Sequence, residues 1–326
     1  MSARLDVLAP HLVQQLLGAP DDASSLRVAR VLARGERERR AASDIDSEIV
    51  AWFGWPSFVG MAGIGAVHDL ADAGGHWLRA DPVYLRADAT RVILFDAASV
   101  GLDDAESDAL LAHLNAGFAA DEMHFERGAA PTRWYVRTTM PMATDAATPR
   151  ALCGSTVEDS LGALRRAGAL NRYMTEAQML LHSAPVNETR SAAGRAPINS
   201  VWFWGGGAAP PARRDASSTV LGDDALLATC AQHAGSVLHA DKRMLAEVLR
   251  GVTGDVLLLD HVDVVDCDIE RFEREVLRPA VAALASGRLT RVVIHDREAE
   301  LSLTRGARWR LWRRGGQFLH ALRAAV

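Results

Sequence analysis

Residues 180–207 read LLHSAPVNETRSAAGRAPINSVWFWGGG, and this is the least random stretch of the chain. Prolines with a fixed φ and asparagines that bond the backbone make a loop rigid, and a rigid loop that carries Arg190 and Arg195 suits an anionic ligand. The apolar run at residues 201–204 predicts a buried strand, and the glycines after it allow the backbone to turn or to approach a ligand closely. The stretch therefore predicts a rigid, basic loop that leads into a core strand.

Two motifs occur in order along the chain. Residues 81–87 read DPVYLRA, and within residues 185–207 the pattern Pro-Val-Asn, Arg, Gly-Arg-x-Pro-x-Asn is followed by an aromatic strand that ends Trp-Gly-x-Gly. Both resemble segments of the archaeal-type cofactor-independent phosphoglycerate mutases, where the first opens an inserted domain. The chain is similar above all to the bacterial RpfE-type regulatory proteins, which share this mutase-like region. The resemblance covers about residues 78–225.

The resemblance implies a fold of the alkaline-phosphatase superfamily. There, two divalent metals held by Asp and His neutralise the transferring phosphoryl group. Residues 1–80 lack the family's Asp-Gly-x-Gly-Asp segment, and the ligand-type side chains further on do not follow the family's pattern. Since a metal site needs a fixed number and geometry of ligands, we predict that the two-metal site is not intact and that no cofactor is bound. Mn²⁺ or Mg²⁺ is expected only if phosphotransfer is retained. The candidate ligands are Asp260, His261, Asp266, Asp268, His295 and Asp296.

Some of these residues follow a predicted strand directly, at the edge where α/β sheets bind ligands. The carboxylate oxygens of Asp260, Asp263, Asp266 and Asp268, with the ring of His261 beside them, could hold a single Mg²⁺ or Mn²⁺. The alternative, which we favour, is that Asp266 or Asp268 caps a helix and the other carboxylates are solvated.

The substrate side of the mutase site is matched better than the metal side. Arginines in both motifs could bind a phosphate or carboxylate through their planar fork, or could pair with neighbouring acidic residues. The asparagines could bond the same ligand or hold their own loops. His182 lies two positions away from the place of the family's histidine. The candidate ligand-binding residues are Arg86, Asn187, Arg190, Arg195 and Asn199.

Composition restricts the class of protein. The 326 residues are 49% hydrophobic and 24% charged with a net charge of −5, which is typical of globular proteins and gives no reason to expect a nucleic acid partner. No apolar run approaches the roughly 20 residues that span a bilayer. The three cysteines, Cys153, Cys230 and Cys267, are widely spaced, which fits a reducing compartment. We therefore expect a cytoplasmic protein with no membrane partner.

Hydrophobic patterning predicts an α/β fold. From residue 81 the alternation of strands and helices predicts a β-α-β-β-α-β, ferredoxin-like domain at 81–207. Continuous apolar runs in residues 208–326 predict parallel strands covered on both faces. Residues 1–80 are expected to form the N-terminal helical part of the core, with a helical hairpin at 5–36 and a solvated helix face at 34–40. The expected architecture is a doubly wound, mostly parallel sheet with an inserted α+β domain.

Three functions remain open from the sequence. The first is a mutase-like regulatory protein that binds a small phosphorylated or carboxylate ligand without phosphotransfer. The second is an active metal-dependent phosphoglycerate mutase or phosphatase with rearranged ligands. The third is a scaffold that binds another protein. The incomplete metal ligands favour the first, although one fold hosts many functions.

Overall fold

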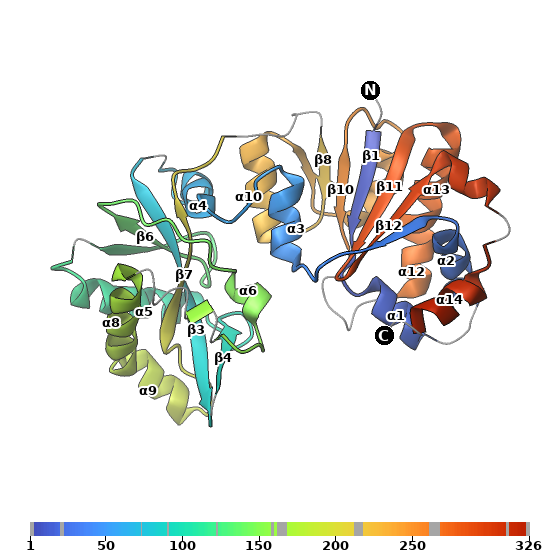
Figure 1. Cartoon of the computed structure of the whole chain (residues 1–326). Coiled ribbons are helices and arrows are strands. Elements are labelled where there is room, and N and C mark those ends of the chain that lie inside the picture. Colours follow the sequence, from blue (N-terminus) through green and yellow to red (C-terminus); the bar gives the residue numbers. More distant parts are fainter. Residues whose placement is uncertain are drawn as a thin grey trace. The chain divides into compact units, whose positions relative to one another are not determined.

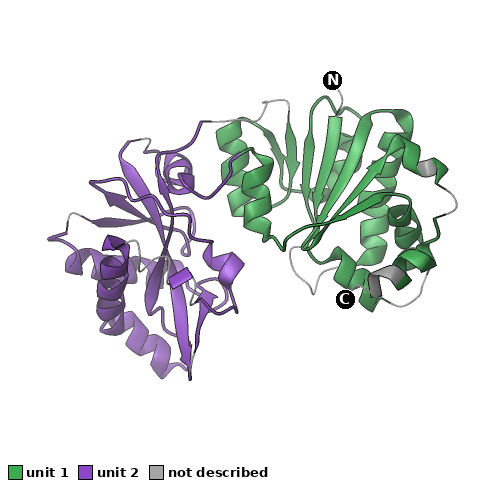
Figure 2. Cartoon of the chain, viewed as in Figure 1, with its two compact units in different colours: residues 1–54, 212–326 green, residues 55–211 purple. Residues whose placement is uncertain are grey.

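The chain forms two compact units, each described here by itself: residues 1–54 with 212–326 make unit 1, and residues 55–211 make unit 2 (Figure 2). No described helix is both long and apolar enough to cross a bilayer. The computed structural model describes residues 3–19, 23–72, 74–89, 91–121, 123–157, 160–161, 168–211, 218–260, 268–310 and 313–323.

Unit 1 contains a seven-stranded sheet in the order β2-β12-β11-β1-β10-β8-β9. The strands from β11 to β9 are all parallel, whereas β12 and then β2 extend the sheet antiparallel. This confirms the predicted, mostly parallel core. The strands are β1 (Ala3–Leu8), β2 (Glu36–Arg39), β8 (Thr219–Leu221), β9 (Val237–His239), β10 (Val256–Leu259), β11 (Leu289–Asp296) and β12 (Ala299–Thr304).

Helices cover both faces of this sheet, as a doubly wound fold requires (Figure 1). One face packs α1, α2, α12, α13 and α14 against alternate strand residues such as Leu5, Val7 and Val292. The other face is covered in part by α3 and α10. The helices are α1 (Leu12–Gly18), α2 (Ala23–Ala33), α3 (Ile45–Trp52), α10 (Ala225–Ala234), α11 (Leu245–Val248), α12 (Ile269–Phe272), α13 (Arg278–Ser286) and α14 (Gly315–Arg323), with the 3-10 helices η1 (Lys242–Met244) and η4 (Arg305–Trp309) and the π-helical segment η3 (Glu273–Leu277).

The N-terminal prediction was wrong in two places. Residues 3–8 form the central strand β1 and not the start of a helical hairpin, although α1 and α2 are helices as expected. A strand buried on both faces lacks the polar alternation that would have identified it. The charged run at residues 34–40 is not a helix face either, because Glu36–Arg39 is the exposed edge strand β2. Its alternating charges protect an edge from pairing with other chains.

Unit 2 contains the predicted strands and helices from β4 onward, but the prediction missed β3, the strand at the centre of its sheet. Its strands lie in the order β7-β3-β6-β5, all antiparallel, and β4 pairs with the C-terminal half of β3. Residues 185–192 were expected to be loop but form helix α9, which begins with a proline at its first turn. The elements are α4 (Met61–Asp69), β3 (His76–Asp88), β4 (Arg91–Asp96), α5 (Asp104–Gly117), β5 (His124–Arg127), β6 (Trp134–Thr138), α6 (Pro149–Leu152), α8 (Ala169–His182), α9 (Pro185–Ala192) and β7 (Ser200–Gly207).

Strand β7 is the best-buried element of unit 2, since all eight of its residues are buried. The indole of Trp204 donates to Asp81 at 2.7 Å, and Arg79 pairs with the same carboxylate while lying 4.9 Å from the Trp204 ring. A Cβ on Gly206 would lie 1.9 Å from the carbonyl oxygen of Met142. This glycine therefore allows close backbone packing within the unit.

Candidate functional site

Arg190 lies inside unit 2 with its side chain fully buried. Its Nε donates to the carbonyl of Ala196 at 2.9 Å, and Nη2 donates to that of Val100 at 2.8 Å. Nη1 donates to the carbonyl of Gly101 at 3.1 Å and to the carboxylate of Glu106. Four of the five guanidinium N–H groups are therefore used to hold α9 against the start of α5.

Arg195 pairs with the same glutamate from a more exposed position. Its Nη1 and Nη2 donate to the two oxygens of Glu106 at 2.7 and 2.9 Å, and Nη2 also donates to the carbonyl of Gly101 at 2.6 Å. The ion-pair alternative left open by the sequence thus describes the contacts of Arg190 and Arg195. Anion binding by these two arginines remains a prediction.

The two asparagines of the motif bond the backbone. Asn187 is buried, donates to the carbonyls of Leu181 and Ile198, and accepts from the N–H of Ile198. Asn199 accepts from the N–H of Leu85 at 2.8 Å and donates to its carbonyl at 2.9 Å. These contacts close the α9–β7 connection and tie it to β3.

Arg86 is the motif arginine that the structure places elsewhere. It is exposed on β3, and its guanidinium lies 5.0 Å from the centre of the Phe95 ring. No described residue forms a hydrogen bond or ion pair with its side chain. Since side chains alternate along a strand, Arg86 and its neighbours Leu85 and Ala87 point to opposite faces of the sheet.

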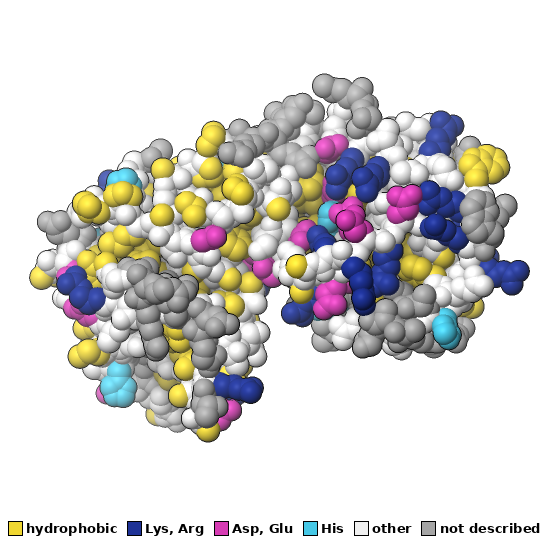
Figure 3. All heavy atoms as spheres, in the orientation of Figure 1, with side chains coloured by type: hydrophobic (Ala, Val, Ile, Leu, Met, Phe, Trp, Pro, Cys, Tyr) yellow, Lys and Arg dark blue, Asp and Glu magenta, His cyan; other side chains and the backbone are white. Residues whose placement is uncertain are grey.

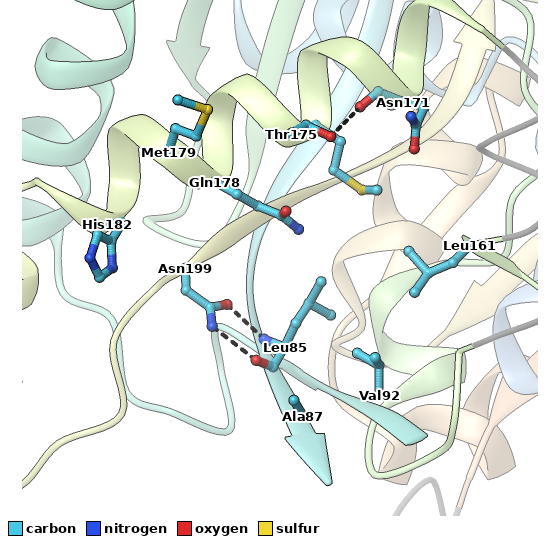
Figure 4. A pocket seen from close by; sticks show the side chains of 11 residues that line it. Leu85, Ala87, Val92, Leu161, Asn171, Thr175, Gln178, Met179, His182 and Asn199 are labelled. Atoms are coloured by element: carbon cyan, nitrogen blue, oxygen red, sulfur yellow. Dashed lines mark hydrogen bonds between the residues drawn. The ribbon is translucent and has the colours of Figure 1, made fainter. Parts of the chain in front are cut away.

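A pocket of about 590 Å³ lies on the Leu85 side of β3, beneath helix α8 (Figure 4). Gln178 donates to Ser200, and Asn199 is bonded to Leu85, so both amides are engaged. No described residue hydrogen-bonds the side chain of Asn171 or of His182. The lining residues are Leu85, Ala87, Val92, Leu161, Asn171, Met174, Thr175, Gln178, Met179, His182 and Asn199. These residues carry no Lys, Arg, Asp or Glu, so the pocket suits a ligand with an apolar body and a polar end.

The carboxyl edge of the parallel sheet in unit 1 carries Asp260. This side chain is fully buried, and Nη2 of Arg271 lies 2.9 Å from its Oδ1. Asp268 caps α12 by accepting from the backbone N–H groups of Glu270 and Arg271, as the favoured alternative predicted. The candidates His261, Asp263 and Asp266 lie outside the described residues.

His295 lies on the face of the sheet opposite the helices α1 and α13. Its Nε2 is 2.8 Å from Oδ1 of the buried Asp6, which also accepts from Trp52 and pairs with Arg4. Burial opposes ionisation of Asp6, but the hydrogen bond with His295 and the charge of Arg4 outweigh it and hold the pKa of Asp6 below its usual value. Figure 3 shows charged side chains gathered over these strands of unit 1.

Asp296 lies next to this network but is bonded differently. Its Oδ2 accepts from the backbone N–H of Val13 at 2.9 Å, at the start of α1. Burial raises the pKa of Asp296 above its usual value, although this hydrogen bond opposes the shift. Asp6 was not among the predicted site residues; a lone carboxylate within the apolar run LDVL was the signal that a buried partner must exist.

The described candidates do not fit a two-metal centre. Asp260 is paired with a guanidinium, Asp268 caps a helix, and His295 is bonded to Asp6. Within the part of the chain that the structure describes, no three His, Cys, Asp or Glu side chains are arranged to hold a metal ion.

Comparisons with known proteins give the fold. No protein-family model matches the chain, and no curated protein does. The structure of the PH0037 protein from Pyrococcus horikoshii is similar, with a TM-score of 0.51 and 13% identity over 98% of this chain and 92% of that one. A cofactor-independent phosphoglycerate mutase from Thermoplasma acidophilum DSM 1728 also matches, with a TM-score of 0.42 and 15% identity over 94% of this chain and 90% of that one. The first likeness shows a shared fold, and the second is too distant to support an argument about the site.

Proposed function

We propose that the chain is a phosphoglycerate mutase-like regulatory protein of the RpfE type, which binds a small ligand and does not transfer phosphoryl groups. The observation that carries this proposal is the pairing of Asp260 with Arg271. Asp260 follows strand β10 directly, at the carboxyl edge of the sheet, where a two-metal site would need a metal ligand. A cation that the protein itself supplies is bonded to that carboxylate.

The energetics of the pair support this interpretation. Asp260 is fully buried and Arg271 is 27% exposed, so a metal ion would meet the guanidinium charge in a poorly solvated place. Removing one partner of a buried ion pair costs about 3–5 kcal/mol. A metal could reach this carboxylate only by displacing Arg271, so the ion pair competes with metal binding.

For the ligand we propose the pocket beneath α8. Asn171 and His182 offer polar groups at its wall, and Leu85, Val92 and Met174 offer apolar surface. Because the described lining carries no Lys or Arg, a carboxylate with an apolar body fits it better than a phosphorylated three-carbon acid. The free thiols of Cys153 and Cys230 are in keeping with a reducing cytoplasm, which we propose as the compartment.

The test is metal content and turnover of the purified chain. After incubation with Mn²⁺ or Mg²⁺ and desalting, we expect less than one metal per chain by elemental analysis. We also expect no mutase or phosphatase turnover of 3-phosphoglycerate, with or without EDTA. Two bound metals together with EDTA-sensitive turnover would refute the proposal and establish the alternative, an active metal-dependent phosphoglycerate mutase or phosphatase.

The ligand site is tested separately with Asn171→Ala and His182→Ala. A thermal-shift screen of small carboxylic acids should find stabilisation that both variants weaken. The control is Met140→Ala, an exposed residue of unit 2 that does not line the pocket. Ligand stabilisation that all three variants retain would place binding elsewhere.

A further inference from the structure

A second pocket, of about 350 Å³, lies in unit 1 between α11 and α13, and its polar lining is made of arginines. Its apolar wall is formed by Leu249, Pro279 and alanines of the two helices. No acidic side chain belongs to its described lining. The four arginines are Arg250, Arg274, Arg278 and Arg288.

Two of these arginines have no carboxylate partner within the described part of the chain. Within the described residues, the side chains of Arg250 and Arg288 form no hydrogen bond or ion pair. Their backbones are nevertheless fixed at helix ends: the N–H of Arg250 donates to Glu247, and the N–H of Arg288 donates to Ala283 at 3.0 Å. The guanidinium groups thus extend from anchored positions on two different elements.

The other two arginines are held in place by glutamates. Arg278 binds Glu273 through Nε and Nη2 at 2.7 and 2.9 Å, and Arg274 binds Glu275 at 2.9 Å. Hydrogen bonding from Arg278 lowers the pKa of the buried Glu273, which stays ionised as an anchor. Glu273 and Glu275 are engaged by these two arginines and by Arg27 and Arg271, whereas Arg250 and Arg288 have no such partner among the described residues.

We propose that this pocket binds a small phosphorylated anion with two or more negative charges, such as a phosphomonoester or a pyrophosphate. Guanidinium groups bind phosphate oxygens through paired N–H donors, and four of them belong to the lining of this one pocket. The net charge of the whole chain is −5, so the excess of positive charge is local. A volume of about 350 Å³ lies at the lower end of the range for small-molecule sites.

This site is independent of the proposed function. It shares no residue with the pocket beneath α8, nor with Asp260 or the motif arginines Arg86, Arg190 and Arg195. Failure of either proposal therefore leaves the other intact.

The test is isothermal titration of the full chain with sodium pyrophosphate at constant ionic strength. Arg250→Gln and Arg288→Gln should each weaken binding about 10- to 100-fold, because each removes charge-assisted hydrogen bonds. The matched control is Arg243→Gln, which removes the same charge from neighbouring η1. Arg243 is exposed, pairs with Asp241 and does not line the pocket.

We expect the control to bind like the unaltered chain, and all variants to keep its melting temperature. Equal weakening by Arg243→Gln would mean general surface electrostatics and would overturn the proposal. Pyrophosphate that binds no more tightly than sulfate would overturn it as well, because the four arginines would then be a solvated surface.

Discussion

The clearest consequence of the structure concerns Arg190 and Arg195, which share one glutamate but differ in burial. We consider replacing each by methionine, which keeps much of the side-chain length and removes the charge. Arg190→Met would remove four hydrogen bonds and leave the carbonyls of Val100 and Ala196 without these donors. An unsatisfied buried acceptor costs about 1–3 kcal/mol, and breaking a buried ion pair costs about 3–5 kcal/mol.

These costs overlap, so we expect Arg190→Met to lower the free energy of unfolding of unit 2 by about 3–5 kcal/mol. The side chain of Arg195 is 41% exposed, and solvent screens its pair with Glu106. Arg195→Met should therefore cost only about 0–1 kcal/mol. Urea unfolding followed by tryptophan fluorescence measures both values, because Trp134 and Trp202 are fully buried in unit 2.

The comparison also decides between the two roles that the sequence left open. A structural role predicts unequal losses of stability and an unchanged response to 3-phosphoglycerate. If Arg190→Met folds as stably as the unaltered chain and loses affinity for the ligand, the reasoning from burial is refuted. Equal losses for both arginines would refute the assignment of the energy to the buried pair.

Other expected outcomes follow from the same contacts. Arg271→Gln should destabilise unit 1 by about 3–5 kcal/mol in urea unfolding, because it removes the cation paired with the buried Asp260. Asn199→Ala should cost about 1–3 kcal/mol, since it removes both bonds to β3. The pKa of Asp6 is lowered on folding, so the ionised Asp6 contributes stability above pH 3.8. That stability is lost as pH falls through the pKa of Asp6 in the folded protein. Asp6→Asn should therefore destabilise the protein at pH 7 but not in strong acid. The pKa of Asp296 is raised on folding, so the stability that its protonated form contributes is lost as pH rises through the folded value. The stability of Asp296→Asn, compared with the unaltered chain, should therefore be more favourable at pH 7 than at pH 4 in the same assay.

The sequence was sufficient where local signals dominate. The apolar run at residues 201–204 predicted a buried strand, and β7 contains this run with every residue buried. The apolar runs in β10 and β11 predicted parallel strands, because a strand that is covered on both faces has no polar alternation. From β4 onward the strands of unit 2 occur in the predicted sequence, whereas the central strand β3 was not predicted.

The sequence was insufficient where a contact joins distant residues. Glu106 pairs with Arg190 and Arg195, which lie 84 and 89 positions further along the chain. Its local role, as part of the capping box at the start of α5, gives no sign of these pairs. The bond between Asp6 and His295 joins residues 289 apart, across two neighbouring parallel strands. Periodicity describes which face a residue occupies, but it does not say which strand lies beside it.

The distribution of arginine contacts bears on where an anion could bind in this chain. The motifs draw attention to Arg190 and Arg195, yet most of their donors are bonded to Glu106 and to backbone carbonyls. An anion there would have to compete with a carboxylate that the fold already supplies, and would leave Glu106 unpaired. Arg250 and Arg288 face no such competitor within the described residues, so an anion at their pocket gains charge-assisted bonds without breaking existing ones. By this argument an anion should bind the arginine pocket of unit 1 more tightly than the motif loop of unit 2.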